Sequence, residues 1–378
     1  DQGIGPHTLA LCGLALLKAG RVERADEILR RADALIPGSP EVHLGLGRLA
    51  RIRNDEVAAV AHLRRSVRSV PFFEEACRQL WRAAWDRGDV AEIEDVRALI
   101  EARYRERSLP LPTSLENGAA LLRGLAGRKL FAMEGAFERL TVPLLAAGNG
   151  RSPIRMIELR LNGGARYPVD IDSASADFLT VSPQLAEELK LVPVGYSVAT
   201  GVGTSSAPVR FAVLDMVELG PVTFRNVPAM VSDLHTFRGQ KKGLLGTALL
   251  KRFNVTIDVA AQALVLYPLD RPDRLAAAIS RGGVAADVPL YCYDATAVEA
   301  ALESAPSALY ILDTAAATNL VDKRFFGDHI KPKLDPSRIV QGGIQGAGGP
   351  QSVNRVEDLE VRLGPLLFPG QQFNEFPM

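Results

Sequence analysis

The spacing of apolar residues divides the chain into two parts with different periods. Up to about residue 107, alanine, leucine, arginine and glutamate recur with a helical period of about 3.6 residues and almost no strand signal. From Ile154 onward, apolar and polar residues alternate, as in Ile154-Arg-Met-Ile-Glu-Leu-Arg-Leu. Alternation of this kind is typical of β-strands. The pattern therefore predicts a helical N-terminal part followed by an all-β part.

A longer period is superimposed on the helical part. Pro37 and Pro71 lie 34 residues apart, and Gly20, Asn54 and Gly88 recur at the same interval. Each of the latter three stands where a helix needs a left-handed residue at its C-terminus. This period resembles that of the tetratricopeptide repeat, with two good copies and a degraded third. The resemblance implies a curved solenoid whose groove holds a peptide or a partner protein; the alternative is a helical bundle without repeats.

Residues 108–153 separate the helical part from the β part. Two prolines interrupt the helical pattern near the start of this segment, and an apolar-periodic stretch then runs from Ser114 to about Phe137. The segment ends in Gly148-Asn-Gly-Arg-Ser-Pro153, which has the composition of a loop. We expect one or two connecting helices followed by a linker.

One short motif occurs twice in the β part. Tyr167-Pro-Val-Asp-Ile-Asp172-Ser-Ala-Ser175 and Leu309-Tyr-Ile-Leu-Asp313-Thr-Ala-Ala-Ala317 both lead from an apolar strand into an aspartate, a hydroxyl residue and small residues. Two carboxylates at close range share one proton and polarise a water between their oxygens, because like charges there cannot both ionise. The motif therefore predicts a two-carboxylate site.

The residues that follow the two motifs share one order. After the first motif we expect a short helix at 182–189 and strands at 209–219, 222–231 and 254–267. A second series starts near Val288, and it has the same order of features. We interpret the two series as an internal duplication.

Particular residues support this duplication. Val361-Arg-Leu-Gly-Pro-Leu-Leu-Phe aligns with Val217-Glu-Leu-Gly-Pro-Val-Thr-Phe. The second copy stops at Met378, whereas the first continues to Pro268. We therefore expect the chain to be a fragment of a longer protein, in which a further stretch completes the second copy.

Composition argues against several classes of function. The chain has 44 Lys and Arg against 44 Asp and Glu, so no net charge attracts nucleic acid or an anionic membrane. Cys12, Cys77 and Cys292 have no metal-ligand spacing and the histidines are scattered, so neither a metal nor another cofactor is expected. No apolar stretch is long enough to span a bilayer. The charge pair Lys241-Lys242 predicts a solvated turn.

The motifs together resemble one protein family. Asp172-Ser-Ala-Ser is followed by Gly243-Leu-Leu-Gly246 and by the closing strand Ala263-Leu-Val-Leu-Tyr-Pro268. This combination is similar to the retropepsin-like aspartic proteases of bacteria, in full over residues 154–268 and in part over 288–378. Bacterial relatives are often extracytoplasmic, so the resemblance favours that location for this chain.

The resemblance implies a multidomain α + β fold. The expected order is tetratricopeptide-like repeats at 1–107, connecting helices and linker at 108–153, a first all-β retropepsin-like lobe at 154–270 and a second, truncated lobe at 285–378.

In that family each lobe supplies one catalytic aspartate, which the resemblance assigns here to Asp172 and Asp313. Ser173 and Thr314 match the hydroxyl residues that cross-link the two aspartate turns. Two glycine-rich hairpins match flaps that close over an extended peptide. Their residues are Thr200, Gly201, Val202 and Gly203 in the first lobe and Gly342, Gly343 and Ile344 in the second.

The chain departs from the family pattern in two ways. The third residue of each turn is Ala174 or Ala315 where the family has glycine, and alanine is tolerated there only if φ is negative. Asp170 replaces an apolar residue and lies on the same strand face as Asp172, so it adds a third negative charge near the site.

The expected function is that of an aspartic endopeptidase that hydrolyses peptide bonds with a water activated by Asp172 and Asp313. The helical repeats are expected to recruit a protein substrate or partner. Two alternatives stay open: a catalytically inactive scaffold that binds peptides with the same fold, and lobes that pair with another chain.

Overall fold

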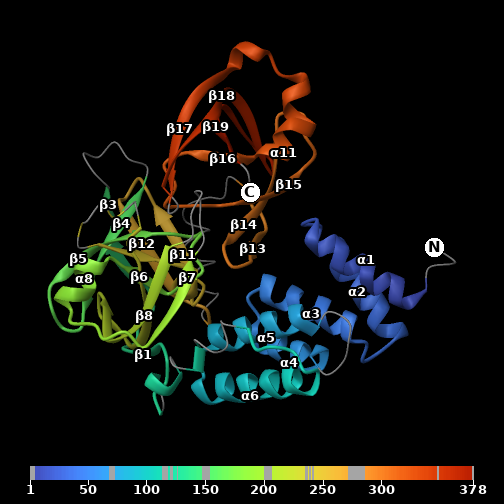
Figure 1. Ribbon diagram of the computed structural model, residues 1–378. Coiled ribbons are helices and arrows are strands. Elements are labelled where there is room, and N and C mark those ends of the chain that lie inside the picture. The colour runs from blue at the N-terminus through green and yellow to red at the C-terminus, as the bar shows by residue number, and fades with distance from the viewer. Residues whose placement is uncertain are drawn as a thin grey trace. The chain divides into compact units, whose positions relative to one another are not determined.

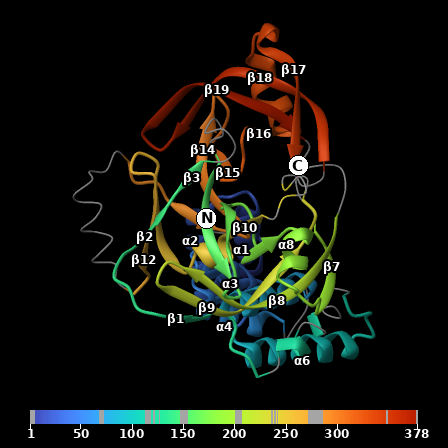
Figure 2. The same cartoon turned by 90° about the vertical axis from the view of Figure 1, so that its left-hand side faces the viewer.

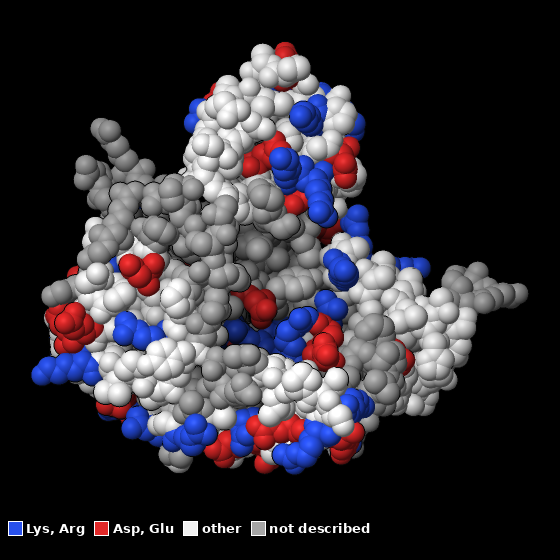
Figure 3. All heavy atoms as spheres, viewed as in Figure 1, with Lys and Arg blue, Asp and Glu red and all other residues white. Residues whose placement is uncertain are grey.

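The computed structural model describes residues 5–67, 73–112, 118–119, 122–125, 127–146, 154–199, 207–234, 237, 240, 242–270, 286–346 and 349–376 (Figure 1). The chain divides into two compact units. The helical unit comprises Asp1–Leu130 together with Tyr291–Tyr293, and the β unit comprises Phe131–Leu290 and Asp294–Met378. Acidic and basic side chains are interspersed over the face shown in Figure 3, as the balanced composition leads one to expect.

The helical unit is built from antiparallel helix pairs (Figure 1). Its helices are α1 (Pro6–Lys18), α2 (Val22–Leu35), α3 (Pro40–Ile52), α4 (Glu56–Ser66), α5 (Phe73–Arg87) and α6 (Val90–Glu106). Gly20, Asn54 and Gly88 follow α1, α3 and α5 with φ of 73°, 60° and 72°. The predicted left-handed residues at these three helix ends are therefore confirmed.

Small residues allow the helices of this unit to approach closely. A Cβ on Gly13 or on Gly45 would lie 2.5 Å from the side chain of Leu29, and one on Gly47 would lie 2.6 Å from that of Leu63. These glycines leave space into which the two buried leucines insert. Asp55 and Asp89 then begin α4 and α6 by accepting hydrogen bonds from backbone N–H groups of the first turn.

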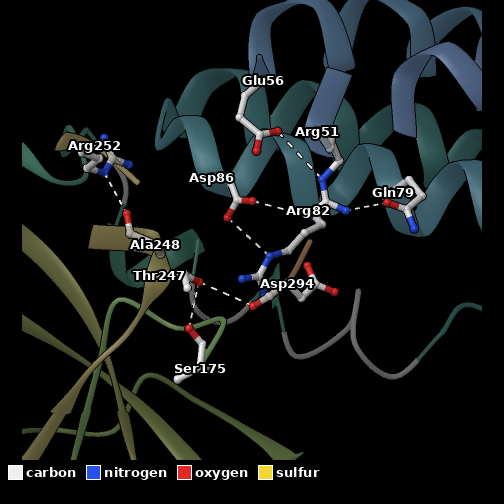
Figure 4. A network of polar contacts seen from close by, with 10 residues as sticks. All are labelled: Arg51, Glu56, Gln79, Arg82, Asp86, Ser175, Thr247, Ala248, Arg252 and Asp294. Atoms are coloured by element: carbon white, nitrogen blue, oxygen red, sulfur yellow. Dashed lines mark hydrogen bonds and ion pairs between the residues drawn. The ribbon is translucent and has the colours of Figure 1, made fainter. Parts of the chain in front are cut away.

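A polar network is buried between α3, α4 and α5 (Figure 4). The guanidinium of Arg51 donates to Gln79 Oε1 at 2.5 Å and lies 3.5 Å from Asp86 Oδ2 and 3.9 Å from Glu56 Oε2. Arg82 lies 3.3 Å from the other oxygen of Asp86. Because the Asp86 side chain is only 6% exposed, removal of either arginine would leave a poorly compensated buried charge.

The β unit contains two lobes, a first lobe at 131–270 and a second lobe at 294–376 (Figure 2). The first lobe consists of β1 (Ala132–Glu134), β2 (Leu140–Pro143), β3 (Leu145–Ala146), β4 (Arg155–Leu161), β5 (Arg166–Ile171), β6 (Leu179–Val181), α8 (Pro183–Glu188), β7 (Gly195–Ala199), β8 (Ala207–Leu219), β9 (Val222–Val231), β10 (Gly243–Leu245), α9 (Thr247–Leu250), β11 (Phe253–Asp258) and β12 (Ala263–Pro268). One sheet has the order β1-β9-β6-β10-β5-β4-β8-β7, with β3 on β4, and another has the order β11-β12-β2.

The second lobe follows the short strand β13 (Leu290–Cys292). Its elements are β14 (Thr296–Leu302), β15 (Ala308–Ile311), β16 (Asn319–Asp322), α11 (Lys323–Phe325), a run of short helical turns over 326–338, β17 (Ile339–Gly346), β18 (Gly349–Leu363) and β19 (Leu366–Phe376). The sheet has the order β13-β14-β18-β19-β16, with β15 on β14 and β17 on β18.

The two lobes share several strand pairings. Leu161 of β4 pairs with Val217 of β8, and Leu302 of β14 pairs with Val361 of β18; Val217 and Val361 are the residues that the sequence alignment equated. β6 runs parallel to β9, and β16 runs parallel to β19. The lobes differ at one place, because β10 lies between β5 and β6 whereas no described strand lies between β15 and β16.

Most strands that alternation predicts are present, but the segment before them differs from the prediction. Residues 118–119 and 122–125 are helical, but residues 132–146 form β1, β2 and β3, which pair with β9, β12 and β4. Buried and exposed residues alternate along β2, but this period of two extends over only four residues. No described helix is long and apolar enough to cross a membrane.

Two histidines form a buried contact between α3 and α4. His43 Nδ1 lies 3.1 Å from His62 Nδ1, and the rings are 5.3 Å apart. Burial lowers the pKa of both histidines. The positive charge of Arg65 lowers both pKa values further, and that of Arg30 lowers the pKa of His62. The negative charge of Asp33 raises both pKa values, and that of Asp55 raises the pKa of His62, but these effects are smaller than that of burial. Because one nitrogen must donate and the other accept, the contact does not tolerate two protonated rings.

This contact predicts that α3 and α4 lose stability in mild acid. An unfolded histidine takes up a proton near pH 6.5 but the folded pair does so only at lower pH, so stability falls as the pH drops through about 6.5. The protection factors of the α3 and α4 amides, which correct for the intrinsic pH dependence of hydrogen exchange, should fall severalfold between pH 7 and pH 5. The fall should be smaller in His62→Gln and the same as in the parent in the control His7→Gln, and an equal fall in all three proteins would contradict the prediction.

Candidate active site

The first aspartate turn follows β5 and is held by its own backbone. Asp172 Oδ1 accepts hydrogen bonds from Ala174 N at 2.8 Å and Ser175 N at 3.0 Å. The backbone N–H of Asp172 donates to Leu245 O of β10 at 2.8 Å. The small residues after the aspartate allow the backbone to turn back toward the carboxylate. The carboxylate is therefore fixed by bonds that arise from its local sequence.

The second aspartate turn follows β15 and uses the same local device. Asp313 Oδ1 accepts from Ala315 N at 2.9 Å. Leu312 N donates to Thr296 O at 2.8 Å, and Thr296 N donates to Ser173 O at 2.8 Å. The start of β14 thus bonds to both aspartate turns.

The hydroxyl residues after the two aspartates bond to each other in a reciprocal pattern. Ser173 N donates to Thr314 Oγ1 at 3.1 Å, and Thr314 N donates to Ser173 Oγ at 3.1 Å. Thr314 Oγ1 in turn donates to Ile171 O at 2.7 Å, and Ser173 Oγ donates to Leu312 O. Each hydroxyl therefore reaches the backbone of the other lobe, and the two aspartate turns are joined directly to each other.

Alanine fits the third position of both turns. The described residues with positive φ do not include Ala174 or Ala315. The methyl group therefore causes no left-handed strain at either position. The departure from the family's glycine is compatible with this turn geometry.

A glycine is needed on the element that supports the first turn. A Cβ on Gly246 would lie 2.1 Å from Asp177 O and 2.7 Å from Ser175 O, distances that real Cβ atoms do not show. The next residue, Thr247, donates from both its N and its Oγ1 to Ser175 O, each at 2.8 Å (Figure 4). In the second lobe the comparable support comes from Asn374, whose Nδ2 donates to Thr318 Oγ1 at 2.6 Å.

Residues 157–249, from β4 to α9, match the family model described as aspartyl protease. This segment is an aspartyl protease family domain. The search of curated proteins finds no match. Among solved structures, conglutin gamma, a basic 7S globulin from lupine seeds, is similar at 11% identity with a TM-score of 0.38, over 64% of this chain and 87% of that chain.

The electrostatics of the aspartyl protease domain differ from those of the second lobe. Burial, the charge of Asp313 and the charge of Asp170 raise the pKa of Asp172 to about 6, against the hydrogen bonds from Ala174 and Ser175. Burial also raises the pKa of Asp313, against the hydrogen bonds from Ala315 and Ala316. Asp313 is nevertheless more exposed to solvent than Asp172, which favours its charged form.

Asp170 is the third carboxyl group near this pair, as its strand position predicted. It is 4% exposed, and its Oδ2 lies 2.5 Å from Lys242 Nζ. Burial raises the pKa of Asp170 and Lys242 lowers it. The interpretation of Lys242 as part of a solvated turn is therefore wrong, because its side chain is only 12% exposed.

The flap residues are described only in part. Thr200, Gly201, Val202 and Gly203 lie outside the described residues. In the second lobe, β17 and β18 form a hairpin in which Gly342 pairs with Val353, Gly343 with Ser352 and Ile344 with Gln351. Ile344 is 7% exposed and packs against Val353 and Phe376, so its side chain belongs to a hydrophobic cluster of the lobe.

Sequence reasoning missed two supporting residues, Lys242 and Thr247. A hydroxyl directly after Gly243-Leu-Leu-Gly246 was a signal for Thr247, and the unexplained Asp170 was a signal for a nearby cation. Among the residues that the structure describes, no group of three or more His, Cys, Asp and Glu is placed to hold a metal ion. The chemistry available at the turns is that of two carboxyl groups.

The reciprocal bonds predict energetic coupling between Ser173 and Thr314. Ser173→Ala and Thr314→Val should each destabilise the β unit by about 1–3 kcal/mol, because each leaves a backbone N–H without its partner. In a double-mutant cycle followed by urea unfolding, the two changes should couple by about 1 kcal/mol or more. Ser307→Ala is the control, since Ser307 Oγ bonds to Ala300 O within the second lobe; additivity of Ser173→Ala with Thr314→Val would contradict the prediction.

The raised pKa of Asp172 predicts how stability depends on pH. The carboxyl titrates near pH 3.8 when unfolded and near pH 6 when folded, so the folded state binds more protons in that window and stability falls as the pH rises through it. Asp172→Asn should therefore raise the free energy of unfolding at pH 7 by on the order of 1–3 kcal/mol, with the gain vanishing near pH 4. Calorimetry over this range checks it against the exposed control Asp328→Asn; a gain independent of pH would exclude the titration of Asp172 as its source.

Proposed function

We propose that the chain is an aspartic endopeptidase in which Asp172 and Asp313 together activate a water to hydrolyse a peptide bond. The observation that carries this proposal is the reciprocal pattern of hydrogen bonds between Ser173 and Thr314, which joins the two aspartate turns to each other. The aspartyl protease family domain at 157–249 supports the same reaction class. The second lobe, which repeats the strand pairings of the first, acts as the second half of the site.

The environments of the two carboxyl groups give them different roles. Asp313 is the more exposed of the two and ionises first, so it acts as the general base that takes a proton from the water. Asp172 keeps its proton to about pH 6 and donates it to the oxygen of the scissile carbonyl group. The attacking water oxygen adds to the carbonyl carbon. The peptide C–N bond then breaks as its nitrogen accepts from Asp313 the proton taken from the water, and Asp172 recovers its own proton as the carbonyl group re-forms.

The two glycine-rich flap segments have a role in binding substrate in this proposal. We assign Gly342 and Gly343 of β17, together with Thr200, Gly201, Val202 and Gly203, to flaps that cover an extended peptide and exclude water. Ile344 anchors the second flap to its lobe by packing against Val353 and Phe376.

The helical unit recruits a protein in this proposal. We interpret its helix pairs as repeats of the tetratricopeptide type, on the basis of the regular left-handed positions Gly20, Asn54 and Gly88. Repeats of this kind present a groove to peptides and partner proteins. The partner is either the substrate itself or a protein that delivers it.

Cleavage of an unfolded, fluorescently labelled protein tests this function. The chain should cleave it in acid, with activity falling above about pH 6 as Asp172 loses its proton. Asp172→Asn and Asp313→Asn should each reduce the rate by at least about a thousandfold, because neither carboxyl alone can supply both the base and the acid. The control Asp328→Asn should retain full activity.

The alternative function is that of a peptide-binding scaffold without catalysis, and the same experiment separates the two. If the chain cleaves nothing between pH 3 and pH 7 yet binds an unfolded polypeptide, its function is that of a scaffold. If cleavage persists in both asparagine variants, the reaction does not depend on these turns.

A further inference from the structure

A buried carboxylate two residues before the candidate catalytic one is unusual on physical grounds. Asp170 lies on β5 with its side chain 6% exposed, where an apolar residue would avoid the cost of burying a charge. Its Oδ1 accepts no hydrogen bond from any described residue. At the corresponding position of the second lobe stands Ile311, an apolar residue that is 59% exposed. The buried charge is therefore particular to the first turn.

The cation that faces Asp170 is held in place by its backbone. Lys242 N donates to Ser182 Oγ at 3.3 Å, and Lys242 O accepts from Ser182 N at 2.9 Å. Lys242 stands directly before β10, a strand that runs parallel to β5 with Leu244 opposite Asp170. At the other end of β10, Leu245 O accepts from Asp172 N at 2.8 Å. One short strand thus connects the charge partner of Asp170 to the backbone of Asp172.

We propose that Asp170 and Lys242 are positioning residues for the catalytic pair, and that the fixed negative charge of Asp170 sets the upper pH limit of the reaction. This inference rests on the proposed function of Asp172 as the proton donor. Lys242, whose Nζ lies 2.5 Å from Asp170 Oδ2, favours the charged form of the buried Asp170, and an ionised Asp170 repels a second negative charge on Asp172. Asp172 consequently holds its proton at a higher pH than burial and Asp313 alone would allow.

The charged groups around Asp172 agree with this direction. Asp313 from the second turn and Asp170 from β5 both raise the pKa of Asp172, and the opposing influences are the backbone N–H groups of Ala174 and Ser175. Lys242 acts on Asp170 and is not among the groups that shift Asp172.

Three variants of the full chain separate this role from simple structural support. In Asp170→Asn, the upper limb of the pH profile for cleavage should move to lower pH by on the order of half a pH unit, with the rate in the acid plateau retained. In Lys242→Met, the uncompensated Asp170 takes up a proton, so the limb should move in the same direction while stability at neutral pH falls. The double variant Asp170→Asn with Lys242→Met should recover that stability. The upper limb of its pH profile should lie at the same pH as that of Asp170→Asn.

The carboxyl signal of Asp172 gives a readout that does not require activity. With aspartate labelled by ¹³C at its carboxyl carbon, and Asp172→Asn used to assign the signal, NMR follows the titration of Asp172 directly. Asp170→Asn should shift this titration to lower pH, whereas the control Asp328→Asn should not. Asp170→Asn preserves shape, so this comparison stands even if Lys242→Met does not fold.

The outcomes for the two proposals are distinct. If the parent chain cleaves nothing but Asp170→Asn shifts the titration of Asp172, the protease function fails and the electrostatic role of Asp170 stands. If the parent cleaves and neither its pH limb nor the Asp172 titration changes in Asp170→Asn, the role proposed for Asp170 and Lys242 is overturned while the protease function remains.

Discussion

Two side-chain hydroxyls hold the halves of the candidate site together. Each aspartate is oriented by N–H groups of its own turn, but the position of one carboxyl relative to the other depends on Ser173 and Thr314. Both residues use their hydroxyl as donor and acceptor at once, from the backbone N–H of one turn to a backbone oxygen of the opposite lobe. A hydroxyl does both with a single short side-chain oxygen. This explains why a serine or threonine directly follows the aspartate in each copy of the motif.

Much of this arrangement follows from residues that are neighbours in the sequence. The strand periods, the left-handed helix ends at Gly20 and Asn54, and the small residues after each aspartate are local properties, and each could be predicted. The strands over 132–146 could not, because their pairing partners on β4, β9 and β12 come later in the chain. Lys242 was misread for the same reason, since only the alignment of β10 beside β5 brings it to Asp170.

Burial is used differently in the two units. In the helical unit, Arg51 and Asp86 form a buried network of opposite charges, where the loss of one partner is costly. In the β unit, Asp172 and Asp313 are like charges held close together by neutral hydrogen bonds, so the folded state gains stability when one of them binds a proton. The two units consequently respond to acid in opposite ways, because the contact of His43 with His62 weakens as the β unit becomes more stable.

The inequivalence of the two carboxyl groups has a consequence for substrate orientation. A peptide has a direction, and a site made from two identical halves accepts either direction equally. Here the first turn has Asp170 and a deeper carboxyl, whereas the second has the exposed Ile311 and Asp313. Under the proposed mechanism, the carbonyl oxygen must face Asp172 and the water must face Asp313. Only one of the two N-to-C orientations of the peptide satisfies both conditions, so joining unlike lobes in one chain selects the direction in which the substrate is read.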